Sequence, residues 1–197
     1  MKYPILFVSL ICLTGCANYN ATSLNTLSSD AVFSSSSEKK EIQVVAKAFN
    51  KADCKRYLDR DVLARGYQPI QLYIENNSDK NYVFALNRIS LSCASSEEVA
   101  KKVHTSTVGR ATGYGVGALF FWPLVIPAII DGVKSSQANE SLDNDFSSKV
   151  ARDQLIFPHS YFNKLLFVPV SEYQNKFYIT LIEKDSLETH QIEVIAS

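Results

Sequence analysis

A stretch of twenty residues without a charge, from Ala111 to Ile130, is the feature that most limits how this chain can fold. Its large apolar side chains each contribute roughly 1.5–3 kcal/mol when buried, so together they outweigh a typical folding stability of about 5–15 kcal/mol. The stretch must therefore be covered by protein or by lipid. Pro123 and Pro127 each remove a helical hydrogen bond, which favours two helices meeting at Trp122 and Pro123 over one straight membrane-spanning helix.

Three glycines at a spacing of four residues, Gly109, Gly113 and Gly117, lie at or just before the start of this stretch. On a helix they would form a smooth stripe that lets another backbone approach closely. Because each glycine weakens an isolated helix by up to about 1 kcal/mol relative to alanine, we expect close packing as compensation. Two interpretations of the apolar hairpin 109–130 remain open: it folds back on its own domain, or it contacts a bilayer or a partner protein. The candidate membrane or partner contacts are Gly109, Gly113, Gly117, Phe120, Phe121 and Trp122.

Helical signals flank the apolar hairpin on both sides. Ser95 followed by Glu97 and Glu98 is typical of a helix start, with a capping hydroxyl and early acidic residues. Beyond the hairpin, apolar residues recur near one face of a helix, with charged residues on the other faces. These apolar residues are Ile130, Val133, Ala138, Leu142, Phe146 and Val150. The pattern predicts a helical insertion over about residues 95–153.

The rest of the chain from Glu41 onward has the short alternating pattern of β-strands. Expected strands cover residues 42–48, 70–74, 82–84, 89–93, 165–168, 177–181 and 192–194. Residues 76–81 are polar and predict a turn that joins two of these strands as a hairpin. The pattern predicts a mainly β fold, an antiparallel sandwich with an inserted helical hairpin. The strand rhythm resembles that of small immunoglobulin-like domains in exported bacterial proteins, a resemblance that implies a fold and no particular activity.

The N-terminus is typical of a targeting segment. Lys2 precedes an apolar core at residues 5–13, which is too short to span a hydrocarbon layer of about 30 Å as a helix. The run Leu13-Thr14-Gly15-Cys16 resembles the lipobox of bacterial lipoproteins, a resemblance that covers residues 1–16 only. It implies that residues 1–15 are a signal peptide, and that Cys16 carries a diacylglyceryl group on sulfur and a fatty acid on its new amine.

This resemblance also predicts where the mature protein works. Several acyl chains give stable anchoring to a membrane, whereas one chain binds only marginally. Ala17, rather than aspartate, follows the cysteine, which favours the outer membrane over the inner membrane in the sorting logic of the family. Residues 16–40 are rich in Asn, Ser and Thr, and we expect a flexible lipidated linker that holds the domain, residues 41–197, roughly 25–30 Å from the lipid.

Two cysteines, Cys54 and Cys93, belong to the predicted domain. In an oxidising envelope such a pair most simply forms one disulfide bond. The alternative is a pair of buried, unpaired thiols that act as small hydrophobic residues. A metal site is not expected, because neither cysteine has a second ligand two to four residues away.

Charge and motifs exclude several function classes. Twenty basic residues balance 20 acidic ones, so nothing favours a nucleic-acid partner. The histidines, His104, His159 and His190, have no metal-ligand or catalytic spacing, and we expect His104 to be a hydrogen-bonded residue at a helix end. Asp59 and Asp61 predict a solvated turn. We therefore expect no cofactor and no enzyme activity.

Three function classes follow from these observations. The first is a non-enzymatic envelope lipoprotein with a binding or scaffolding role, attached to the membrane by its lipid and able to bind an envelope protein. The alternative is a membrane-inserting or oligomer-forming lipoprotein that acts through the hairpin 109–130. A hydrolase with an unrecognised site is the third.

Overall fold

The computed structural model describes residues 18–27, 41–104 and 125–197, and the side chains of all of these except 125–135. The chain divides into two units. One comprises Tyr19–His104 and Asn139–Ser197 and is called the β unit here. The other comprises Met1–Asn18 and Thr105–Ala138, and its described part is Asn18 and the first part of helix α4.

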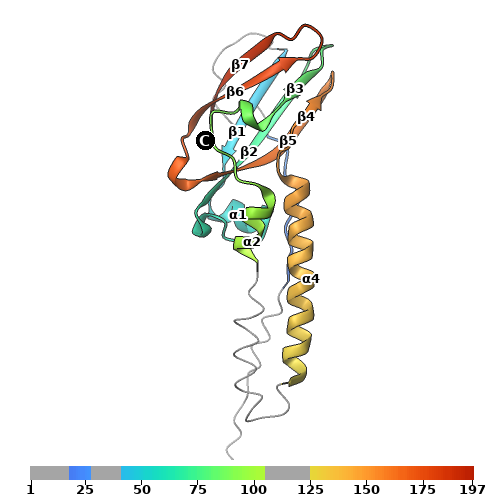
Figure 1. The fold of residues 1–197 in the computed structure, drawn as a ribbon, viewed down its shortest axis with the longest axis vertical. Coiled ribbons are helices and arrows are strands. Elements are labelled where there is room, and N and C mark those ends of the chain that lie inside the picture. The colour runs from blue at the N-terminus through green and yellow to red at the C-terminus, as the bar shows by residue number, and fades with distance from the viewer. Residues whose placement is uncertain (1–17, 28–40, 105–124) are drawn as a thin grey trace, which may run out of the picture. The chain divides into compact units, whose positions relative to one another are not determined.

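The described part of the β unit is mainly β and contains two antiparallel sheets (Figure 1). The sheets have the strand orders β1-β2-β5 and β4-β3-β6-β7. This confirms the predicted mainly β fold class. The strands are β1 (Ile42–Ala48), β2 (Tyr67–Asn76), β3 (Tyr82–Phe84), β4 (Gln154–Ile156), β5 (Ser160–Pro169), β6 (Lys176–Glu183) and β7 (Thr189–Ile195).

Three α-helices complete the described fold: α1 (Lys51–Leu58), α2 (Ser96–Val103) and α4 (Val125–Lys149). Single turns of 3₁₀-helix occur at η2 (Leu63–Arg65), η3 (Leu86–Arg88) and η5 (Val170–Glu172). The predicted start of α2 is confirmed, because the Ser95 side chain accepts a hydrogen bond from the amide of Glu98. Sequence analysis did not predict α1, which Asn50 begins through a reciprocal capping box with Asp53.

The first core lies between the two sheets. Alternate residues of β2 and β6 point into it and are almost completely buried, as the two-residue period predicted. They are Ile70, Leu72 and Ile74 from β2, and Phe177, Ile179 and Leu181 from β6.

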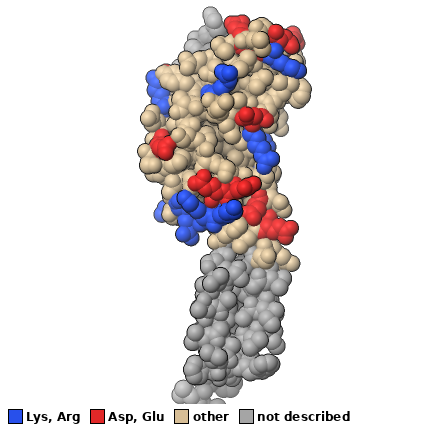
Figure 2. Space-filling model, viewed as in Figure 1, with Lys and Arg blue, Asp and Glu red and all other residues tan. Residues whose placement is uncertain are grey.

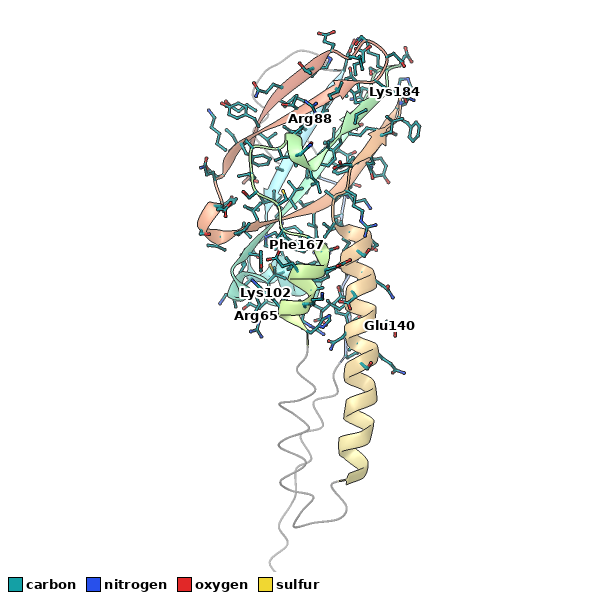
Figure 3. The ribbon with its side chains drawn as sticks, viewed as in Figure 1. Arg65, Arg88, Lys102, Glu140, Phe167 and Lys184 are labelled. Atoms are coloured by element: carbon teal, nitrogen blue, oxygen red, sulfur yellow. The ribbon has the colours of Figure 1, made fainter. Side chains whose placement is uncertain are left out.

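A second core lies between the outer face of the sheet β1-β2-β5 and the helices. Leu58 of α1, Val99 of α2 and Phe146 of α4 belong to this core together with Phe167 of β5, and all four are buried. Figure 3 labels Phe167 at this position. Strand β5 is therefore buried on both faces, which explains why residues 165–168 form a continuous apolar run instead of an alternating one. Of the predicted apolar face of α4, the described members Ala138, Leu142, Phe146 and Val150 are buried.

The predicted hairpin between residues 70–74 and 82–84 is wrong. Strands β2 and β3 lie in different sheets, and the partners of β3 are β4 and β6. The buried Asn76 side chain donates to the carbonyls of Lys80, at 2.7 Å, and Phe157, at 2.9 Å, and accepts from the amide of Ser78. These bonds make residues 76–81 a crossover between sheets, because the same turn chemistry can serve either connection.

The predicted strand over residues 89–93 is also wrong. Ile89 makes a single bridge to Ile179 in one sheet, and Ala94 makes a single bridge to Phe167 in the other. The segment therefore crosses from sheet to sheet. The alternating apolar residues of this segment are nevertheless buried, because Ile89 and Leu91 both belong to the first core.

Candidate functional site

One end of the β unit carries a network of polar groups from several elements. This end, called the α end here, is formed by α1, α2, the last turns of α4 and the described residues 19–27 (Figure 1). Arg65 and Lys102 lie at the α end, and Lys184 lies at the opposite end of the β unit (Figure 3). Basic and acidic side chains gather side by side at the α end (Figure 2).

Residues 19–27 are attached to the β unit along their length. The Thr22 amide donates to the carbonyl of Arg56 at 2.9 Å, and the side chain of Gln71, only 1% exposed, donates to the carbonyl of Asn25 at 2.6 Å. Tyr19 and Leu24 pack against the second core. The predicted flexible linker over 16–40 is therefore wrong for residues 19–27, because two apolar anchors and paired backbone groups offset the entropy of ordering.

Lys149, at the end of α4, joins this segment to two helices. Its ammonium donates to the carbonyl of Thr22 at 2.8 Å, to the carbonyl of Tyr57 at 2.7 Å and to the carboxylate of Asp145 at 2.7 Å. The residue is only 8% exposed. All three donors of the ammonium are thus used, which is what burial of a charged group requires.

Tyr19 also attaches the N-terminal segment, residues 19–27, to α4. Its hydroxyl donates to the carboxylate of Asp145, and its ring lies 5.3 Å from the guanidinium of Arg60. Burial, and then the Asp145 carboxylate, raise the pKa of Tyr19 above its usual range. The phenol therefore stays protonated and acts as a hydrogen-bond donor at this position.

The turn after α1 differs from the solvated turn that Asp59 and Asp61 predicted. Asp59 ends α1 in a left-handed conformation (φ 49°), and its side chain is only 11% exposed. Burial alone would raise the pKa of Asp59, but Lys55, the amide of Asn20 and Arg60 stabilise the carboxylate and lower it. Asp61 is exposed, as predicted.

His104 has the role that the sequence predicted. It ends α2, and its Nε2 lies 2.6 Å from Oδ1 of Asp143 on α4. Asp143 and Asp145 belong to the same turn of α4 and hold His104 and Tyr19 respectively. Tyr19, the first residue of the β unit, and His104, where its first stretch ends, therefore both lie at the α end.

A polar cleft of about 380 Å³ lies beside this turn, between α2 and α4. Its lining can offer hydrogen bonds and both signs of charge to a ligand. The lining residues are Ser96, Glu97, Ala100, Lys101, Asp143, Asn144 and Ser147.

The structure contains Cys54 and Cys93 as free cysteines, so it contradicts the predicted disulfide bond. Cys54 is fully buried in the second core, whereas Cys93 packs against the first core. The sheet β1-β2-β5 separates these two cores. Burial raises the pKa of each thiol to about 11, which matches the alternative of two inert, buried cysteines.

The other predicted site residues lie outside the described residues. They are Cys16, Gly109, Gly113, Gly117, Phe120, Phe121 and Trp122. Within the described part of the chain, no helix has both the length and the apolar character needed to cross a bilayer.

No sequence pattern predicted that Tyr19, Asp145 and Lys149 lie together. Tyr19 and Asp145 are 126 residues apart, so their contact has no local pattern. One usable signal was present: Asp145 and Lys149 stand four residues apart on a helix, beside the buried Phe146.

Comparisons of the chain with protein-family models, with curated proteins and with solved structures found no match.

Proposed function

We propose that this chain is a non-enzymatic lipoprotein of the bacterial envelope, anchored through lipid on Cys16, with a binding or scaffolding role at the membrane. The outer membrane is the favoured location, because Ala17 follows the lipidated cysteine. The observation that carries the proposal is the attachment of Tyr19 to Asp145 and of His104 to Asp143 on one turn of α4.

The attachment of Tyr19 brings the β unit close to the proposed anchor. Three residue steps separate Cys16 from Tyr19, and an extended chain spans at most about 3.3–3.6 Å per residue. The lipidated residue is then within about 11 Å of Tyr19, much nearer than the 25–30 Å expected from a flexible linker. On this proposal the α end faces the membrane.

The same geometry favours a second candidate, in which the apolar hairpin 109–130 inserts into the bilayer or forms oligomers. Residues 105–138 and the anchored N-terminus both depart from the α end. The bilayer that holds the lipid is therefore the nearest apolar phase for a stretch that must be covered. Trp122, an aromatic residue beside a proline, suits the membrane interface.

For the fold of the β unit, we propose an immunoglobulin-like sandwich. In the constant-type immunoglobulin arrangement, the first, second, fourth and fifth strands share one sheet, and the third, sixth and seventh share the other. The same grouping holds here, except that the fourth strand, β4, pairs with the third. The grouping of the other six strands supports the proposal.

The anchor is tested by Cys16→Ser. We expect the variant to lose fatty-acid labelling. We also expect it to lose the part of its membrane association that the lipid supplies. A variant that keeps full fatty-acid labelling would refute the lipoprotein proposal. The unmodified chain, expressed and fractionated in parallel, is the control.

Bilayer contact can be tested through Trp122, the only tryptophan of the chain. The purified lipoprotein is placed in vesicles whose acyl chains carry bromine, a fluorescence quencher. We expect quenching of Trp122 if the hairpin enters the bilayer. The matched control is the double variant Trp122→Phe/Phe157→Trp, because Phe157 is 59% exposed on the β unit and its carbonyl binds Asn76, far from the α end.

Equal quenching in both proteins, or none in either, would contradict insertion of the hairpin and leave the scaffolding role. Oligomer formation is tested separately by Gly113→Leu and Gly117→Leu, which remove the small-residue stripe. We expect dissociation of any oligomer that depends on close helix contact. An oligomeric state identical to that of the unmodified chain would exclude the stripe as its interface.

A further inference from the structure

Three potential metal ligands meet at the end of the β unit opposite the α end. Glu183 ends β6, His190 lies in β7, and Glu188 belongs to the turn between these strands. Two backbone hydrogen bonds shape the turn, from the amide of Glu183 to the carbonyl of Glu188 at 2.8 Å and from the amide of Leu187 to the carbonyl of Glu183 at 2.9 Å. One ligand atom from each of the three side chains lies within 4.8 Å of the other two.

Two of these ligand atoms are shielded from solvent. Oε2 of Glu183 and Nε2 of His190 lie 4.0 Å apart, and neither has a hydrogen-bond partner among the described residues. Glu183 is only 7% exposed. The ring of Tyr82 meets the imidazole edge to face at 5.5 Å, which restricts the orientation of His190. Lys80 pairs with Oε2 of Glu183, so Nε2 of His190 is the shielded atom that lacks a partner among the described residues. Buried polar atoms are nearly always paired, and this nitrogen therefore points to a missing ligand.

Lys80 balances part of the negative charge. Its ammonium lies 3.0 Å from Oε2 of Glu183 as an ion pair, without the geometry of a hydrogen bond, and 3.8 Å from Glu41. The Lys80 side chain is 42% exposed and can move into solvent.

We propose that Glu183, Glu188 and His190 form a binding site for a divalent transition-metal ion of the zinc class. Imidazole nitrogen and carboxylate oxygen are ordinary zinc ligands, and two carboxylates neutralise the charge of the ion. In a tetrahedral site with bonds of about 2.0–2.2 Å, ligand atoms lie roughly 3.3–3.6 Å apart, so the three side chains need to close by up to about 1.5 Å around the ion. Glu188 is exposed and lies in a turn, where such a movement meets little resistance.

Metal binding at this site would have two structural consequences. The ion would fasten the β6–β7 turn by joining residues from both strands. It would also displace the ammonium of Lys80 from Glu183, because two cations cannot share one carboxylate oxygen at close range.

The test is calorimetric titration of the full chain, in detergent and stripped with a chelator, with zinc chloride. We expect one zinc ion per chain. His190→Ala is expected to weaken binding by at least about tenfold, since even the loss of an outer-shell partner has an effect of that size. Lys80→Met is expected to tighten binding, because it removes the competing cation.

His159→Ala is the matched control. His159 is also near this end of the β unit, is 65% exposed and pairs with Asp79 at 2.9 Å, so its loss should leave zinc affinity unchanged. Circular dichroism checks the fold of each variant. Should His190→Ala misfold, Glu188→Gln, at an exposed position, is expected to show a similar loss. Absence of zinc binding by the unmodified chain, or equal affinity in a folded ligand variant, would overturn the proposal.

Discussion

Lys149→Met separates the electrostatic role of Lys149 from its packing role. The variant keeps an unbranched apolar side chain but removes the ammonium that joins Thr22, Tyr57 and Asp145. Each hydrogen bond from a charged donor contributes about 1.5–3 kcal/mol, so three such bonds are worth roughly 5–9 kcal/mol before desolvation. Burial of the ammonium costs several kcal/mol, and this cost is absent in the variant, which offsets part of the loss. We therefore expect the free energy of unfolding to fall by about 2–4 kcal/mol.

Urea unfolding of the purified mature chain, followed by circular dichroism, measures this difference. The matched control is Lys164→Met, because Lys164 makes one hydrogen bond within the described part of the chain, to the carbonyl of Ser148 at 2.6 Å. Its expected loss is about 1 kcal/mol or less. Hydrogen exchange supplies a second readout: the amide of Thr22, bonded to Arg56, should exchange faster in Lys149→Met and at the native rate in the control.

One result would refute this reasoning. If Lys149→Met and Lys164→Met unfold at the same urea concentration, and the Thr22 amide exchanges at the native rate in both, then the buried ammonium does not hold residues 19–27 on the β unit.

Further expectations concern the crossover, the thiols and acid stability. Asn76→Ala should lower the unfolding free energy by about 2–4 kcal/mol in urea titrations, because it leaves buried carbonyls unpaired. Cys54 and Cys93 should resist iodoacetamide in the native chain at neutral pH and both react after unfolding without reductant; no reaction then would reveal a disulfide. The pKa of Asp59 lies below its usual 3.8, so the unfolded state binds more protons and stability falls as the pH drops below about 4. Asp59→Asn should flatten this pH dependence of the urea midpoint, and an unchanged dependence would contradict the role of Asp59.

Some elements of the fold were predictable because their signal is local. Strands β6 and β7 alternate with a period of two, because each packs one face against the core, and neighbouring residues within one stretch of sequence show this pattern. The start of α2 was equally predictable, because Ser95 and Glu98 form the cap within one turn. The apolar positions of α4 follow from helical spacing alone.

The candidate site was mostly not predictable, because its residues are distant in sequence. Nothing near Tyr19 indicates that a carboxylate 126 positions away will bind its hydroxyl, and the polar composition of residues 16–40 predicted a free linker instead. Likewise, Glu183 and His190 lie just outside the predicted strands 177–181 and 192–194, and no local pattern indicates that the turn brings them together.

The sequence by itself determined most of the apolar residues that are buried, where most strands lie and where α2 begins, because apolar periodicity and capping depend on neighbours within a few positions. Only the tertiary structure decided which strands pair, that residues 76–81 cross between sheets, that Cys54 and Cys93 lie in separate cores, and that residues 19–27 are held on the β unit. These outcomes depend on contacts between distant segments, whose free energies add up only when the whole unit folds.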